Sequence, residues 1–221
     1  MITFLRIKKI LFIIFSFNKK IFDLYIKNSD LLIDVGSNIG QFSLLYNLYF
    51  PKSDILSFEP NKEANYIYNK VFKSNRNIKL FSIGLSDIKK IQKLYITKSN
   101  DNSSFYLPLS ENKKYEVLKT TNVETNLFDN FNFKLNNYTK VLLKIDVQGF
   151  ELNVLKGFDK SLKYIKYVII EVSFIKLYDN QDLFLSIKKF LENNNFRLIK
   201  EYNIQKSNSS KIQSDLIYEQ K

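Results

Sequence analysis

The sequence predicts an α/β protein with a mostly parallel sheet and helices on both of its faces. The prediction rests on a repeated pattern of a short apolar run, a turn and a segment with helical periodicity. Three such units are clear, and they begin at Leu31, Asp54 and Val141. The chain has 221 residues, of which 45% are hydrophobic, and this suits one domain with a full core.

The first unit contains a glycine turn. Leu31–Val35 is an apolar run with one acid, Asp34, and its length suits a strand buried on both faces. Gly36 and Gly40 bracket the turn that follows, where glycine permits a positive φ and lets a ligand approach the backbone. The next helix directs its N-terminal N–H groups toward this turn. We expect a nucleotide-type cofactor site here, although a plain strand-to-helix corner would also explain the two glycines.

The second unit ends at an acid. Asp54–Phe58 is strand-like and is followed by Glu59 and Pro60. An acid at the end of the second strand binds ribose hydroxyls in doubly wound folds, and a spacing of about 20 residues after the glycine turn fits that role. Pro60 favours a helix start because no backbone N–H is needed there. Glu59 is therefore a candidate ribose ligand.

The third unit carries two charged residues on its strand. Val141–Val147 is apolar apart from Lys144 and Asp146, which share one face by the two-residue period of a strand. Gly149 marks a turn, and we expect a helix from Glu151 to about Leu162. Ligands of open α/β sheets bind outside the carboxyl ends of the strands, so Asp146 is expected beside that crevice.

The motifs, in this order, resemble those of the FkbM-type S-adenosylmethionine-dependent methyltransferases, and the resemblance runs from about Leu31 to Val172. It departs from the family's usual residues at Gln148 (usually Glu), Gly84 (usually Ala) and Ser37 (usually Ala). Because Gln148 is neutral, any family role of this position that depends on a negative charge is in doubt for this sequence. The resemblance implies a Rossmann-like class I methyltransferase fold with a seven-stranded sheet and a C-terminal antiparallel strand pair. It rests on Asp34-Val35-Gly36-Ser37-Asn38-Ile39-Gly40-Gln41, Phe58-Glu59-Pro60-Asn61, Leu85-Ser86-Asp87 and the stretch from Leu143 to Gly157.

The same resemblance implies S-adenosyl-L-methionine as the cofactor. Ser86 and Asp87 would lie near its adenine end, although a plain turn explains these two residues equally well. The residues expected at the cofactor are Asp34, Gly36, Ser37, Asn38, Gly40, Gln41, Glu59, Pro60, Ser86, Asp87 and Asp146.

Methyl transfer to a hydroxyl benefits from a general base. The sequence contains no His and no Cys, so the base must be Asp, Glu, Lys or Tyr. Asp146 is the best candidate, and capping of the following helix is its structural alternative. Glu151 and Glu171 would position the acceptor, and Lys144 would tune a carboxylate. One clear acid is too little to predict a metal site.

The remaining segments predict supporting elements. Residues 78–83 and 166–172 are further strands, and residues 196–202 and 213–218 form a final strand pair. A polar loop at 97–104 is either plain solvated chain or a lid beside the cofactor. Residues 61–73 predict a helix, with an apolar stripe of Ala64, Ile67, Tyr68, Val71 and Phe72.

Composition and charge indicate the cell compartment and the kinds of binding partner to expect. The net charge is +12, but the lysines are dispersed and no arginine-rich arm occurs, so nucleic-acid binding is not expected. Zero cysteines fit a cytoplasmic enzyme. Residues 1–28 are expected to form a helical segment packed on a methyltransferase domain of residues 29–221. The alternative is a basic helix at a membrane surface, so at most peripheral membrane contact is expected.

The function that the sequence favours is O-methylation of a hydroxyl on a sugar, glycan or secondary metabolite, with a small-molecule or glycan acceptor. One alternative is a catalytically silent domain that keeps the cofactor fold without turnover. A nicotinamide-dependent oxidoreductase is less favoured, because the G-x-G-x-x-G spacing is missing. The sequence does not predict the oligomeric state.

Overall fold

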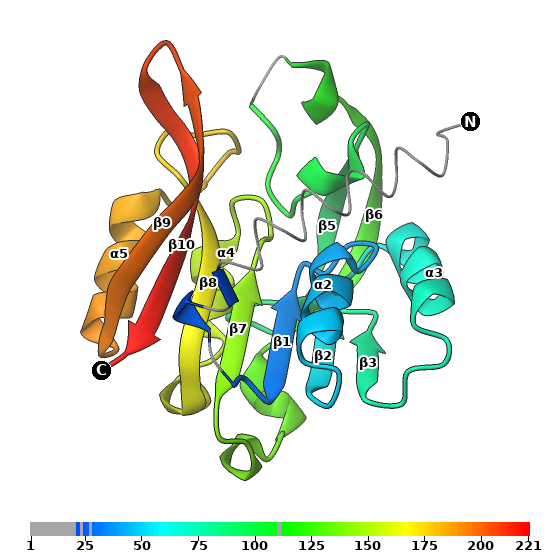
Figure 1. Ribbon diagram of the computed structural model, residues 1–221. Helices are drawn as coiled ribbons and strands as arrows, with labels where there is room; N and C mark the ends of the chain where they lie inside the picture. The colour runs from blue at the N-terminus through cyan, green and yellow to red at the C-terminus, as the bar shows by residue number, and fades with distance from the viewer. Residues whose placement is uncertain (1–20, 23, 27, 110–111) are drawn as a thin grey trace, which may run out of the picture.

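The computed structural model describes residues 21–22, 24–26, 28–109 and 112–221. Its centre is a seven-stranded sheet in the order β3-β2-β1-β7-β8-β10-β9 (Figure 1). The first five of these strands are parallel, while β10 runs antiparallel to both β8 and β9. This confirms the predicted fold class. The strands are β1 (Leu31–Val35), β2 (Asp54–Phe58), β3 (Ile78–Phe81), β7 (Val141–Ile145), β8 (Ile165–Ser173), β9 (Phe196–Ser207) and β10 (Ser210–Gln220).

Helices cover both faces of this sheet. Leu45 and Tyr46 of α2 (Gln41–Tyr49) pack on one face with Leu32 and Leu142, whereas the other face is covered by α4 (Glu151–Lys156) and α5 (Phe184–Asn193). The helix α3 (Lys62–Val71) lies beside α2 (Figure 1). The strands are too apolar to face water on either side, which explains the two-sided cover.

Strand register brings the three motifs to one edge. Val35 pairs with Phe58 of β2 and with Ile145 of β7. The next residues along the chain are Gly36, Glu59 and Asp146, so all three leave the sheet at the same level. The carboxyl edge of a parallel sheet is where such folds bind ligands.

A second, three-stranded sheet in the order β4-β6-β5 was not expected from the sequence. It contains β4 (Gly84–Leu85), β5 (Lys90–Thr97) and β6 (Val117–Asn126), and it stands above the carboxyl edge of the main sheet (Figure 1). The predicted third strand therefore ends at Phe81, and the chain crosses into β4. Strand β6 is mostly exposed and polar, so it carries little of the apolar alternation that would reveal a strand.

Two helix predictions need correction. Helix α4 ends at Lys156 rather than near Leu162. The next residue, Gly157, passes so close to Ser86 that a Cβ there would lie 2.3 Å from the Ser86 carbonyl oxygen, so this position requires glycine. In α3 the side chains of Ile67 and Val71 are exposed (42% and 46%) rather than buried. Asn65 is buried in their place, since its amide donates to the Glu59 carbonyl at 2.9 Å.

The prediction for residues 1–28 lies largely outside the described residues. Of the part that is described, Ile21, Phe22 and Ile26 are buried, and Phe22 contacts the rings of Phe42 and Tyr46 on α2. None of the helices in the described ranges is long and apolar enough to cross a membrane.

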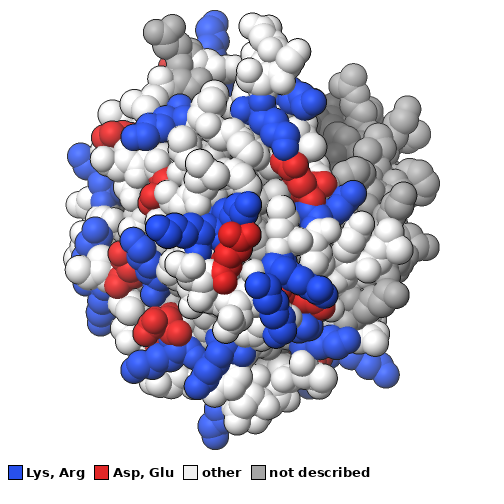
Figure 2. Space-filling model, turned by 90° about the vertical axis from the view of Figure 1, so that its left-hand side faces the viewer, with Lys and Arg blue, Asp and Glu red and all other residues white. Residues whose placement is uncertain are grey.

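Charged side chains are dispersed over the face formed by β9 and α5. Figure 2 shows basic side chains there, with acidic ones between them. Several are paired, including Lys188 with Glu192 at 3.8 Å and Arg197 with Glu219 at 2.7 Å. This arrangement agrees with the interpretation of most lysines as solvated surface.

Candidate active site at the carboxyl edge of the sheet

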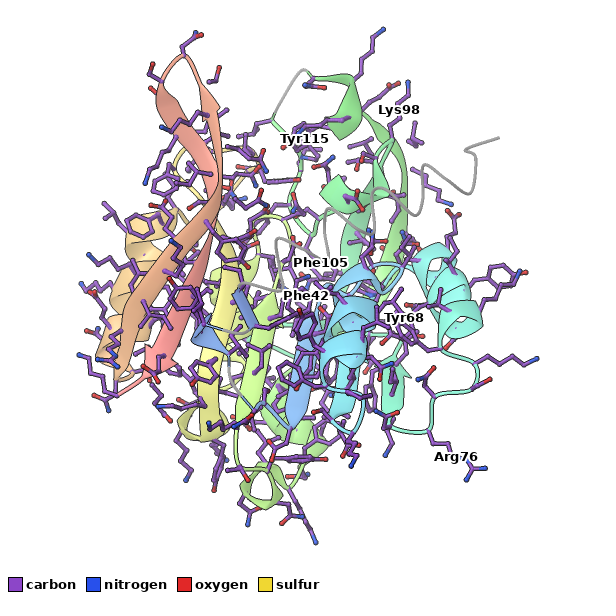
Figure 3. All side chains as sticks on the ribbon, viewed as in Figure 1. Phe42, Tyr68, Arg76, Lys98, Phe105 and Tyr115 are labelled. Carbon is purple, nitrogen blue, oxygen red and sulfur yellow. The ribbon has the colours of Figure 1, made fainter. Side chains whose placement is uncertain are left out.

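A cavity of about 650 Å³ opens above the carboxyl edge of the parallel strands. Its floor is formed by the turns after β1, β2 and β7. One wall is the loop after β5, including Asn102 and Phe105, and the opposite wall is the β9–β10 hairpin. Phe42 of α2 also lines the cavity, and Figure 3 labels it together with Phe105.

The glycine turn is held against the end of β7. Gly36 has φ 74°, and a Cβ added there would lie only 1.9 Å from the carbonyl oxygen of Asp146. Gly40 has φ 91° and packs against the ring of Phe72, at 2.5 Å from an added Cβ. Gly36 lines the cavity and Gly40 does not. Close packing therefore requires glycine at both positions, and only at Gly36 does the backbone also face the cavity.

The next two residues of the turn present polar groups. Ser37 is buried and lines the cavity, and its Oγ has no hydrogen-bond partner among the residues that the structure describes. The Asn38 side chain donates to Asp101 at 2.5 Å and connects the turn to the wall formed by the loop after β5. A buried hydroxyl without a partner is rare unless a ligand or water completes it. The turn thus fits a cofactor that carries hydrogen-bonding groups.

Glu59 braces the turn and also lines the cavity. Its carboxylate accepts backbone N–H groups from Asn38 at 2.9 Å and from Asn61 at 2.8 Å. Burial outweighs these hydrogen bonds and raises the pKa of Glu59 to about 7. A carboxylate has about four acceptor positions, so two remain for ligand hydroxyls. Pro60 lines the cavity beside it.

Lys144 connects the glycine turn to Asp146. Its Nζ lies 3.5 Å from Asp34 Oδ1 and 3.4 Å from Asp146 Oδ2, and it donates to the Gly36 carbonyl at 3.3 Å. Burial acts against the charged form, but the carboxylates of Asp146 and Asp34 outweigh it and hold the pKa of Lys144 above its ordinary value. Asp34 is fully buried, accepts from Ser43 at 2.7 Å and does not line the cavity. It acts on the site through Lys144.

A group of acids and amides lines the cavity next to the glycine turn, on the side of β7, β8 and β10. Asp146, with 39% of its side chain exposed, accepts the Gln148 amide at 2.9 Å. The same amide donates to Glu171 at 2.7 Å, and Gln213 donates to Glu171 at 3.1 Å. Burial and the neighbouring acids Asp146 and Asp215 raise the pKa of Glu171 well above its usual range. Asp146 and Glu171, both predicted, therefore meet on this side of the site.

Three other predicted residues lie outside the cavity lining. Glu151 is buried under the turn after β7, where it accepts N–H groups from Gly149 at 2.9 Å and from Val147 at 3.4 Å. Burial raises the pKa of Glu151 to about 7. Ser86 is buried and donates to Asp87 at 3.0 Å, so these two residues form a turn beside the lining residue Leu85. Gln41, by contrast, lines the cavity as expected.

The walls of the cavity contain residues that sequence reasoning missed. The loop at 97–104 is not plain solvated chain: Asn102 and Ser104 are buried, and residues 101–104 line the cavity. From the hairpin come Tyr202, Asn203, Gln205, Gln213 and Asp215. The strand pair was predicted, but not its place at the cavity; the signal was Gln213 and Asp215, which share one face of the strand just before the apolar run Leu216-Ile217-Tyr218.

Acidic side chains in the described ranges are not grouped as a metal site would require. The cavity is lined by the polar groups of the glycine turn and Glu59 and, next to them, by Asp146 and Glu171.

Comparison with known proteins agrees with this geometry. Residues 34–198 match the methyltransferase FkbM domain. Methyltransferase 1 of Beauveria bassiana is 25% identical over 186 residues, which cover 77% of this chain and 73% of the relative. The hexuronic acid methyltransferase AglP of Haloferax volcanii is 27% identical over 154 residues, covering 66% of this chain and 57% of the relative.

Solved structures share the fold. The FkbM methyltransferase of Methylobacillus flagellatus superposes with a TM-score of 0.55 at 12% identity, over 86% of this chain and 43% of that one. The magnesium protoporphyrin IX methyltransferase of Synechocystis, solved with bound SAM, superposes with a TM-score of 0.52 at 10% identity, over 98% of this chain and 82% of that one. The chain thus spans less than half of the first structure and just over half of AglP. The domain match covers most of the sequence, and its motifs surround one cavity, so this chain belongs to the FkbM family of methyltransferases.

Proposed function

We propose that this protein transfers a methyl group from S-adenosylmethionine to a hydroxyl oxygen of a sugar, glycan or secondary metabolite. The observation that carries the proposal is one cavity lined by the glycine turn and Glu59, which follow β1 and β2, and by Asp146 and Glu171 from the side of β7 and β8. A methyltransferase of this kind must hold a cofactor and an acceptor end to end, because an in-line displacement needs both reactants aligned. The name of the relative AglP, a hexuronic acid methyltransferase, supports a sugar-type acceptor.

The residues of the glycine turn and Glu59 fit the cofactor. Glu59 would accept ribose hydroxyls with the acceptor positions that the backbone leaves open. Ser37 would use its unpartnered Oγ, and Gly36 and Gln41 would complete the contact. Phe42 would cover the cofactor with an apolar ring. When bound, S-adenosylmethionine supplies a methyl group on a positively charged sulfur.

Asp146 would act on the acceptor hydroxyl. Its carboxylate is partly exposed to the cavity and would take the hydroxyl proton as the oxygen–carbon bond forms and the sulfur–carbon bond breaks. Lys144 would hold the Asp146 carboxylate in place through its ion pair at 3.4 Å. Glu171 and Gln213 would orient the acceptor from the side of β8 and β10.

Calorimetry tests the cofactor part of the proposal. We expect S-adenosylmethionine and S-adenosylhomocysteine to bind with similar affinity, and NAD not to bind. Release of S-adenosylhomocysteine would then be measured against a panel of hydroxylated sugars, nucleotide-sugars and phenolic or macrocyclic metabolites. Cofactor binding without turnover on any acceptor would favour the silent binding domain. Binding of NAD alone would contradict the proposal.

A further inference from the structure

Gln148 makes four hydrogen-bond contacts at the turn after β7. Its backbone carbonyl accepts the Ser104 hydroxyl at 2.6 Å. Its side-chain Oε1 lies 2.9 Å from the Tyr178 hydroxyl, whose single proton is shared with the Asn102 carbonyl at 3.0 Å. The Nε2 atom donates to Asp146 Oδ1 at 2.9 Å and to Glu171 Oε2 at 2.7 Å. The side chain is buried, and its backbone has φ 55°.

The chemistry of the amide explains these contacts. A primary amide carries two N–H donors, and Gln148 directs one to each carboxylate. Neither donor remains for an acceptor molecule, so the residue acts on the site through Asp146 and Glu171. A glutamate in its place would have no N–H and would bring a third carboxylate within hydrogen-bond distance of the other two.

Among the described residues that line the cavity, Lys144 and Lys114 carry a positive charge, and Lys114 is exposed to solvent. Lys144 on β7 is the cation that lowers the pKa of Glu171, and it already lies between Asp34 and Asp146. The other titratable groups that act on Glu171 and on the adjoining Tyr178 are Asp146 after β7, Glu151 on α4, Asp215 on β10, and Tyr115.

We propose that Gln148 is a positioning residue whose amide holds the carboxylates of Asp146 and Glu171 in a fixed relation at the acceptor end of the cavity. The glutamine is thus not a sign of lost activity. Its neutral amide lets the two acids lie close together, because it donates one hydrogen bond to an oxygen of each carboxylate and fixes the orientation of both. A glutamate at position 148 could hold the other two carboxyl groups in this way only when one of the three carboxyl groups is protonated.

The variant Q148E tests this through stability at different pH values. The added acid has a folded-state pKa above its unfolded value, so the native state binds more protons and its stability falls as pH rises. At pH 5 the melting temperature should lie within about 2 °C of the parent. At pH 8 it should lie roughly 5–10 °C below the parent, as expected for an uncompensated buried charge.

Two further variants make the result specific. The double variant Q148E/E171Q removes one of the three acids and provides an amide next to position 148, so at least half of the extra loss at pH 8 should be recovered. The control is Q181E: Gln181 is also buried, but its Oε1 accepts the N–H groups of Leu177 and Tyr178, and its Nε2 faces the Ser173 hydroxyl. A serine can donate to a carboxylate, and the hydrogen-bond partners of the Gln181 side chain among the described residues include no acid, so this control should lose less stability between pH 5 and pH 8 than Q148E.

Three outcomes would overturn the inference. These are a Q148E curve parallel to that of the parent, a pH-dependent loss that E171Q leaves unchanged, and failure of Q148E to fold even at pH 5, where a protonated glutamic acid resembles glutamine. These melts require no acceptor and no turnover. Calorimetry of the parent with S-adenosylhomocysteine therefore reports on the proposed function separately.

Discussion

Asp146 is the side chain whose replacement should separate chemistry from binding. The variant Asp146→Asn keeps the shape and can still accept the Gln148 amide, but it cannot take a proton. With an active acceptor, we expect kcat to fall by about 10²–10⁴ while the affinity for S-adenosylhomocysteine stays within twofold. The measurements are steady-state turnover and calorimetry. Full turnover in the folded variant would show that Asp146 is not the general base.

Glu59 should contribute to the binding of the cofactor. Glu59→Ala removes the acceptor of two backbone N–H groups and the expected ribose contact together, so the Kd for S-adenosylhomocysteine should rise by roughly 10- to 100-fold. Glu63 is the matched control, because it is an exposed acid at the start of α3 whose partner is the surface residue Lys119. Equal affinities of the two alanine variants would remove Glu59 from the cofactor site.

At the scale of elements, the contact between the β1 turn and the β7 turn is the most sensitive point. Gly36→Ala places a Cβ against the Asp146 carbonyl at a positive φ, and we expect a loss of roughly 2–4 kcal/mol of unfolding free energy. Gly84→Ala is the comparison: there the nearest atom is the far end of the Phe105 ring, which can move. Chemical denaturation measures both. Similar losses would show that the Gly36 contact is not special.

The elements also show what the sequence could and could not predict. Strands β1, β2, β7 and β8 were predictable because buried parallel strands are continuous apolar runs, and Gly36, Glu59 and Asp146 stand directly after them. The sheet β4-β6-β5 was not, because β4 has only two residues and β6 is mostly exposed and polar, so neither shows a clear apolar pattern. Glu151 looked catalytic because of its motif, but the structure buries it under a turn, which only the tertiary contacts reveal.

For the whole molecule, the buried acids predict a stability that declines toward alkaline pH. Burial raises the pKa of Glu59 and of Glu151 to about 7, and that of Asp215 to about 6. Their folded-state pKa values exceed the unfolded ones, so the native state binds more protons and stability falls from about pH 4.5 to 7. Lys144 has a raised pKa, whose contribution stays constant over this range.

Thermal melts between pH 5 and pH 8 would measure this decline. The melting temperature should be highest near pH 5 and lower at pH 8. Glu151→Gln should flatten the curve, because it removes one of the titrating groups. A melting temperature that rises steadily from pH 5 to pH 8 would contradict the assignment.

One wall of the cavity lies beyond the segment that the family shares. The FkbM match ends at residue 198, whereas Tyr202, Asn203, Gln205, Gln213 and Asp215 follow it and line the cavity. If the proposed acceptor contacts are correct, we expect residues 199–220 to vary with the acceptor among relatives, while the residues proposed to bind the cofactor stay the same. Chimeras that exchange residues 199–220 between relatives would show whether acceptor choice travels with them.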